Sequence, residues 1–220
     1  MTGYNPAESH DEMPSSLPLF PLPGALLLPR GQLPLNIFEP RYLAMVDDAL
    51  KTHRMFGMIQ PDPEGGEERP PLFKVGCAGR ITQFAESGDG RYIITLTGVS
   101  RFTMLEEIPA TTPYRQGRVD FEPFAADFKA RDGEEQVDRD GVLKALRDFA
   151  EENQLQIDWD SINQAPNEAL VNALSMMSPF GPREKQALLE ASDLKGRAEV
   201  LVAITEIELA RGRNASSTLQ

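Results

Sequence analysis

Residues that break regular backbone structure crowd the start of this chain and constrain its fold most. Seven prolines and glycines fall between residues 18 and 34. Proline lacks an amide donor and pushes the residue before it toward extended conformations, so this density excludes a long helix. The apolar segments between the breaks suit edge or bulged strands, and they are Leu17–Phe20, Ala25–Leu28 and Leu33–Phe38.

A stronger strand pattern follows further along the chain. Leu72–Phe84 contains an alternating apolar run, Glu86–Arg91 is a turn cluster with two glycines, and Tyr92–Thr97 is rich in β-branched and aromatic residues. Together they predict a hairpin. Gly98 is expected to end the second strand. Three more strands are expected at Met55–Ile59, Val99–Leu105 and Tyr114–Phe121.

One helix interrupts these strands. Pro40 suits a first helical turn, and an apolar stripe of Leu43, Val46 and Leu50 predicts a helix that ends near His53. The segment 61–71 holds four prolines and two glycines, and it is expected to be a surface loop.

The second half of the chain has helical spacing. Helices are expected around Val142–Ala150, over Asn167–Met177, from Pro182 to Leu189 and from Asp193 to Arg211, the last with Ser192 as its N-cap. Strands therefore precede helices, which favours an α+β fold over a doubly wound sheet. We expect a disordered tail (1–16), a β-rich subdomain (17–125), a charged linker (126–136), a helical subdomain (137–212) and a flexible tail (213–220).

The charge of the chain limits its partners. The formal net charge is -12, and residues 120–220 carry 20 of the 34 acidic side chains against 11 basic ones. Such a surface repels phosphates, so no nucleic acid and no anionic membrane is expected as a partner. The start of the chain lacks the pattern of a secretory signal, and the single cysteine excludes a disulfide scaffold, so a cytoplasmic location is expected.

A search for catalytic motifs finds none. The chain has neither a phosphate-binding G-x-x-x-x-G-K-[ST] loop nor a G-x-S-x-G nucleophile elbow. Cys77, His10 and His53 supply too few ligands for a zinc site, and Cys77 falls on the apolar face of an expected strand. No catalytic residue, metal or cofactor is therefore expected.

Several ordered motifs carry a family resemblance. Leu17–Arg41 reads LPLFPLPGALLLPRGQLPLNIFEPR, and Gly76–Ile81 and Gly98–Phe102 follow it as shorter motifs. This arrangement resembles the N-terminal substrate-binding domain of Lon proteases, in the short bacterial form without ATPase and peptidase domains. The resemblance implies a PUA-like pseudo-barrel followed by a helical bundle. It covers about residues 17–212.

The signature segment supplies the candidate site residues. Leu35, Ile37 and Phe38 are expected in the core, while Glu39 and Arg41 flank the helix start, where Arg41 can pair with Glu39 or with a backbone carbonyl. A mainly structural role for the signature stays open. If a ligand surface exists, we expect it where the signature, the proline-rich loop and the helices meet. The candidate peptide-binding residues are Leu35, Ile37, Phe38, Glu39, Arg41, Tyr42 and Arg101.

Three functions stay open at this point. The first is a non-enzymatic module that binds proteins or peptides, such as an adaptor for unfolded or damaged polypeptides, present as a monomer or weak homodimer. The second is an RNA-binding PUA-like module, which would need a basic stripe formed by Arg80, Arg91, Arg101, Arg115 and Arg118. The third is a small hydrolase that uses carboxylates without a recognisable motif.

Overall fold

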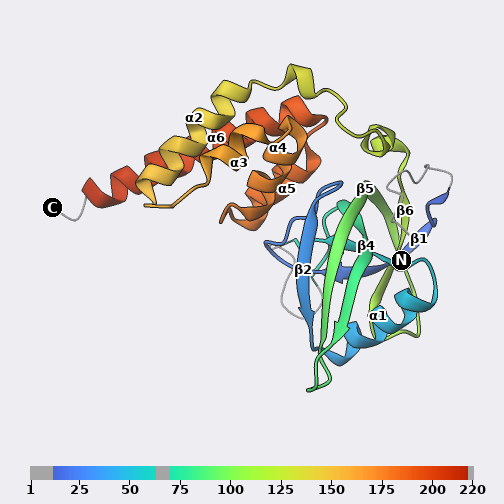
Figure 1. Ribbon diagram of the computed structural model, residues 1–220. Coiled ribbons are helices and arrows are strands. Elements are labelled where there is room, and N and C mark those ends of the chain that lie inside the picture. Colours follow the sequence, from blue (N-terminus) through green and yellow to red (C-terminus); the bar gives the residue numbers. More distant parts are fainter. Residues whose placement is uncertain (1–11, 63–69, 218–220) are drawn as a thin grey trace.

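The protein has a β-rich part and a helical part that meet along one side. A computed structural model describes residues 12–62 and 70–217, with side chains as far as residue 212. Figure 1 shows the strands and one helix on the right, and the remaining helices above and to the left of them. The α+β class expected from the sequence is confirmed. Most of the expected loop at 61–71, most of the expected N-terminal tail and the last three residues of the expected C-terminal tail lie outside the described residues.

Six strands form the β-rich part, and five of them close into a ring. The sheet order is β2-β5-β4-β3-β1-β6, and β5 also pairs with β6, so that β2 alone stays outside the ring. The expected pseudo-barrel is therefore present. The strands are β1 (Ser16–Pro21), β2 (Gln32–Ile37), β3 (Met55–Ile59), β4 (Val75–Glu86), β5 (Tyr92–Ile108) and β6 (Arg115–Asp120).

Two predictions about strands are wrong, one at Gly98 and one at Ala25–Leu28. β5 runs through Gly98 without a break, because a side chain at this position would overlap the carbonyl group of Leu28, and glycine leaves that space free. The segment Ala25–Leu28 is not a strand. Its three leucines are all buried, so it lacks the alternation of a strand with one exposed face.

Helix α1 (Pro40–Lys51) covers one face of the β-rich part. Its buried face consists of Tyr42, Met45, Val46 and Ala49, rather than the predicted stripe of Leu43, Val46 and Leu50. Those two leucines are only partly buried. Tyr42 packs edge-on against Phe20 with 4.2 Å between ring centroids, and this aromatic contact joins the helix to β1.

Two short 3-10 helices and five α-helices make up the second half. The expected helices are present, but Ser192 is not the N-cap of α6, because the Asp193 side chain accepts the hydrogen bond from the Gly196 amide. The expected linker contains a buried residue, Asp127. The elements are η2 (Glu122–Phe128), η3 (Glu134–Gln136), α2 (Arg139–Glu152), α3 (Trp159–Gln164), α4 (Asn167–Met177), α5 (Pro182–Glu190) and α6 (Leu194–Ser217), which extends into the expected tail.

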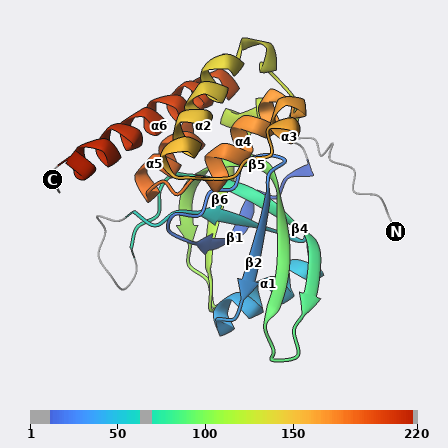
Figure 2. The same cartoon turned by 60° about the vertical axis from the view of Figure 1, so that its left-hand side comes forward.

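Two apolar cores hold these elements together. The smaller one fills the ring around Phe102, which is fully buried. The larger one is continuous from α1 through Leu26–Leu28 to the helical residues Leu188, Leu194 and Leu201. Figure 2 shows the helices as a layer over the strands. Since both parts share this core, the helical part is packed onto the β-rich part rather than tethered to it.

Candidate functional site

The apolar residues of the signature occupy three different environments. Ile37 is buried, with 1% of its surface exposed, whereas Phe38 is 61% exposed. Leu35 is partly buried against the larger core. The prediction that all three are core residues is therefore wrong for Phe38, which follows the end of β2 and has the Arg91 guanidinium 6.0 Å from its ring centroid.

The residues at the start of α1 form a small surface cluster. Arg41 donates to Glu39 Oε2 from Nε (2.9 Å) and pairs with the same oxygen through Nη2 (2.8 Å), as the sequence predicted. The Arg41 guanidinium also lies 4.5 Å from the centroid of the Tyr42 ring. Tyr42 itself is buried, and burial raises the pKa of its hydroxyl. The first turn of the helix is held by the Glu39 carbonyl, which accepts from the amides of Tyr42 (2.9 Å) and Leu43 (3.0 Å).

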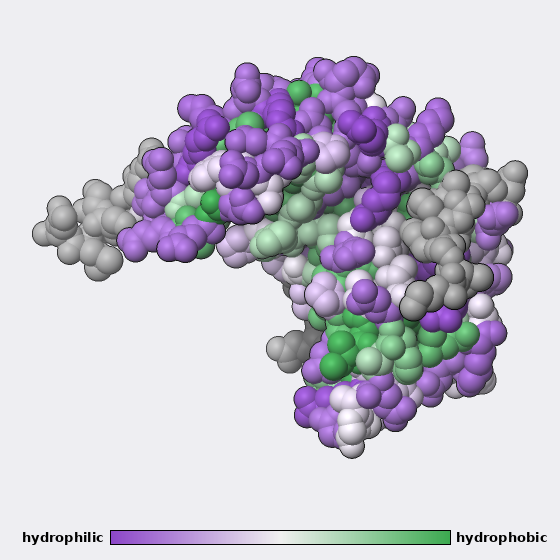
Figure 3. Space-filling view, viewed as in Figure 1, coloured by the Kyte–Doolittle hydropathy of each residue, from purple (hydrophilic) through white to green (hydrophobic). Residues whose placement is uncertain are grey.

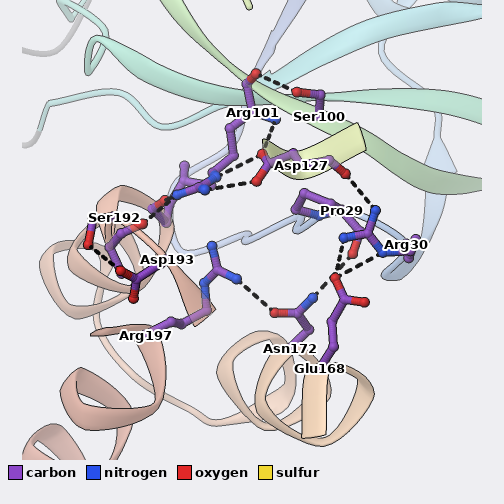
Figure 4. A network of polar contacts seen from close by, with 12 residues as sticks. Pro29, Arg30, Ser100, Arg101, Asp127, Glu168, Asn172, Ser192, Asp193 and Arg197 are labelled. Atoms are coloured by element: carbon purple, nitrogen blue, oxygen red, sulfur yellow. Dashed lines mark hydrogen bonds and ion pairs between the residues drawn. The ribbon is translucent and has the colours of Figure 1, made fainter. Parts of the chain in front are cut away.

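Arg101 lies inside the protein, where it joins the strands to the helices. Only 3% of its surface is exposed. Its guanidinium donates to both carboxylate oxygens of Asp127, at 2.9 and 2.8 Å, and to the carbonyl of Leu189 at 3.1 Å. Figure 4 shows the contacts between Arg101 and Asp127 as part of a larger polar network. Because nearly all of this side chain is buried and engaged in these contacts, its place among the candidate site residues is not supported.

The same network ties the middle of the signature, at Pro29 and Arg30, to α4. Asn172 donates to the carbonyl of Pro29 (3.2 Å) and accepts from the buried Arg197 (3.0 Å). Arg30 donates from Nε to Glu168 (2.9 Å) and from Nη1 to the carbonyl of Asp127 (2.6 Å). Burial, and next the positive charge of Arg101, lower the pKa of Arg197 to about 10.

Arg30 is held in an unusual backbone conformation within this network. Its φ angle is +63°, a left-handed value that non-glycine residues seldom adopt. Its amide donates to the Gly98 carbonyl (2.8 Å), which fixes the backbone while Glu168 fixes the side chain. Such conformations persist where surrounding contacts over-determine them, and they often mark functional sites.

An apolar cavity of about 470 Å³ lies beside this network, where the start of β2 meets α4. Arg30 and Glu168 stand at its edge, and Met176 and Met177 form part of its wall, with Met177 82% exposed. Figure 3 shows a notch between the helical and β-rich parts, with apolar side chains gathered on the β-rich part below it. The cavity has the size and apolar character of ligand sites in proteins. Its apolar wall comes mainly from Pro29, Leu33, Pro34, Pro166, Ala169, Ala173, Met176 and Met177.

This cavity meets the sequence expectation only in part. The signature and the helices do come together, through Pro29–Pro34 and α4, but Leu35, Ile37 and Phe38 do not line the cavity. Pro61 and Pro70, which belong to the described ends of the proline-rich loop, line a different and more polar hollow with Arg41 and Arg115. The two methionines that end α4 were not singled out from the sequence, although two adjacent methionines at the end of a helix are a usable signal.

The described residues offer no metal-binding cluster and no accessible cysteine thiol. Within residues 12–62 and 70–217, no group of three or more histidine, cysteine or acidic side chains could hold a metal ion. Cys77 is completely buried, and burial raises the pKa of its thiol, so that the reactive thiolate is disfavoured. None of the described helices combines the length and apolarity needed to cross a membrane.

Comparison with known proteins identifies the family. Residues 16–206 match the family described as the ATP-dependent protease La (LON) substrate-binding domain. The chain belongs to this LON substrate-binding domain family. Among curated relatives, the Lon protease of Parabacteroides distasonis is 30% identical over 208 residues, which cover 91% of this chain and 25% of the relative. The Lon protease of Flavobacterium johnsoniae is 26% identical over 215 residues. The LON substrate-binding region thus spans about a quarter of the length of these relatives.

Two solved structures of Lon N-terminal domains share the fold of this chain. The Lon N-terminal domain protein from Xanthomonas campestris superposes with a TM-score of 0.62 at 24% identity, over 86% of this chain and 97% of that one. The N-terminal domain of the Mycobacterium avium complex Lon protease gives the same TM-score at 20% identity, over 87% and 98%. At this identity the likeness concerns the fold, and the family match carries the assignment.

Proposed function

We propose that this LON domain binds polypeptide segments that lack stable tertiary structure, in the cavity between β2 and α4, without catalysing a reaction. The observation that carries the proposal is the apolar wall of the cavity, with Met176 and the exposed Met177. Methionine side chains are unbranched and polarisable, so they adapt to apolar groups of different shapes. Such a surface suits a binder that accepts many sequences.

The rim of the cavity supports a peptide ligand over a charged metabolite. Its charged side chains come in both signs, as Arg30 with Glu168 and Arg131 with Glu134, and each pair is already joined by a salt bridge. A phosphate or carboxylate ligand would have to compete with these carboxylates. A peptide segment with an uncharged backbone and apolar side chains would not have to compete with them.

We further propose that the LON domain acts as an adaptor that recognises unfolded or damaged polypeptides in the cytoplasm of a bacterium. The support is the family's description as a substrate-binding domain and the bacterial origin of the similar proteases. A buried free thiol at Cys77 is also compatible with a reducing compartment.

The test measures the affinity of the purified protein for a labelled, reduced and alkylated protein that cannot fold. We expect Met177→Asp to weaken this binding at least about tenfold, because the carboxylate would have to leave water when an apolar group packs on it. Ile207→Asp on α6 is the matched control, since Ile207 is also exposed (50%) but does not line the cavity. Equal binding by both variants and the native protein would overturn the proposed site.

An RNA-binding function receives no support from the arginines that suggested it. Arg91, Arg101, Arg115 and Arg118 each pair with an acidic side chain, and Arg80 donates to the carbonyl of His53 at 2.9 Å. A guanidinium that already bonds a carboxylate contributes little positive potential to a surface. The four ion pairs are Arg91–Asp89, Arg101–Asp127, Arg115–Glu107 and Arg118–Glu106.

A further inference from the structure

Strand β2 forms an open edge of the sheet. It pairs with β5 from Gln32 to Ile37, and no other described strand lies along its outer side. Gln32, Pro34 and Asn36 are all exposed, and within the described residues no hydrogen bond involving their side chains occurs. An edge of this kind presents main-chain groups that another extended chain can pair with.

The direction of these main-chain groups follows from two independent features. Pro34 has no N–H, so it cannot occupy a position that donates to β5. At the start of the strand, the Gly98 amide of β5 donates to the carbonyl of Gly31 at 2.9 Å. Main-chain hydrogen bonding alternates along an antiparallel strand. Both features therefore indicate that the N–H and carbonyl groups of the odd-numbered residues of β2 point toward β5. Gln32 and Asn36 therefore direct an N–H and a carbonyl group outward, and Pro34 directs a carbonyl group only.

This open edge runs into the apolar cavity. Gln32, Leu33 and Pro34 belong to β2 and also line the cavity, opposite Ala173 and Met176 of α4. A chain paired with β2 would project every second side chain toward the face that carries Leu33. The edge thus supplies main-chain hydrogen bonds, and the cavity supplies a place for apolar side chains.

We propose that β2 binds its polypeptide ligand as an added strand, with apolar side chains at alternate positions directed into the cavity. This inference rests on the proposed function and specifies the ligand as an extended segment with few acidic residues. The net charge of -12 disfavours an acidic ligand. Alternating apolar residues are typical of strands that are half-buried in folded proteins, so such a segment is exposed only when its own protein is unfolded.

Pro34 sets the strength of this interaction. Because it lacks an N–H, one carbonyl group of the added strand has no donor opposite it, at the centre of the edge. Proline on an edge strand also limits unwanted pairing between sheets. The missing donor therefore keeps binding weak and reversible.

The test uses a fluorescent peptide with alternating valine and serine, a net positive charge and two N-methylated versions. One version carries methyl groups on the amides of the valines, the other on those of the serines. We expect one version to lose at least about tenfold in affinity and the other to bind like the parent, because only alternate amides face β2. Equal effects of both methylation patterns would overturn the added-strand inference.

Two variants test the same inference from the protein side. We expect Pro34→Ala to tighten peptide binding about threefold to tenfold by restoring one donor, and Gln32→Pro to weaken it by a similar factor. Thermal unfolding of each variant checks that the fold is kept. If both variants bind the peptide like the native protein, the added-strand inference is wrong. The proposed function is tested separately, by the binding of the unfolded protein to Met177→Asp.

Discussion

Asp127 accepts three hydrogen bonds from Arg101, two from the guanidinium and one from the backbone amide, all within 2.9 Å. The strand residue Arg101 reaches on to the carbonyl of Leu189 at the end of α5. The carboxylate and the guanidinium are both almost fully buried, at 9% and 3% exposed side chain. The pair therefore joins the ring of strands to the helices through a contact from which water is excluded.

Removing one partner of this pair should destabilise the protein strongly. We expect Asp127→Ala to lower the free energy of unfolding by about 3–5 kcal/mol, because it leaves the Arg101 charge buried without a counter-charge. Urea unfolding measures the change. Glu106→Ala breaks an exposed pair with Arg118 and should change stability by less than about 1 kcal/mol. A loss of the same size in both variants would contradict the role given to the buried pair.

Gly57 should not tolerate a methyl group. A Cβ at this position would lie 2.8 Å from the buried ring of Phe102 and 3.2 Å from Leu19. We therefore expect Gly57→Ala to cost about 1–3 kcal/mol in unfolding experiments. Gly88→Ala in the exposed β4–β5 turn meets nothing within 4 Å and serves as the control. The double variant Gly57→Ala/Phe102→Leu should lose less stability than the sum of the losses of the two single variants, because the clash with the ring is relieved. Strict additivity of the two losses would exclude such a clash.

Tyr114 should make the protein sensitive to alkaline pH. Burial, and next the hydrogen bond to Asp48 (2.9 Å), raise the pKa of Tyr114 from 10.0 to about 12. The folded protein holds this proton where the unfolded chain loses it, so the stabilisation is complete below pH 10 and is lost as the pH rises through 12. Urea unfolding between these pH values should show a falling stability that is less steep in Tyr114→Phe. An unchanged slope would contradict the assignment.

Cys77 should report on unfolding. The thiol is completely buried, and burial raises its pKa, so a thiol reagent has neither access nor a thiolate to attack. We expect labelling of the native protein to be slow and to accelerate with urea along the same curve as the loss of helical circular dichroism. Since Cys77 is the single cysteine, the signal needs no correction for other thiols. Rapid labelling without denaturant would show that the strand around it opens locally.

Local patterns predicted most of the elements of this fold. The hairpin of β4 and β5 and helix α4 carry strong signals in turn residues and apolar spacing, and both are present. Gly98 misled the prediction because glycine can end a strand or admit a neighbouring backbone, and only the fold shows that Leu28 lies against it. Phe38 was misassigned for a related reason, since the end of β2 determines which way its side chain points.

The candidate site was much harder to predict than the elements that build it. Its walls come from Pro29–Pro34 and from α4, which are separated by more than a hundred residues and meet only through tertiary packing. Asp127 stands in a charged segment that reads as an exposed linker, yet it is buried because Arg101 lies opposite. Neither relationship produces a periodic pattern of residues, so neither could be predicted from the spacing of residues in one sequence.

The shared core has a consequence for how the chain is made. Leu26–Leu28 leave the ribosome early, but the core that buries them also contains Leu188, Leu194 and Leu201 of the last two helices. The ring of strands can therefore form on a nascent chain while part of its apolar surface is still uncovered. Until α6 has been synthesised, this module would itself display the kind of exposed apolar segment that it is proposed to recognise.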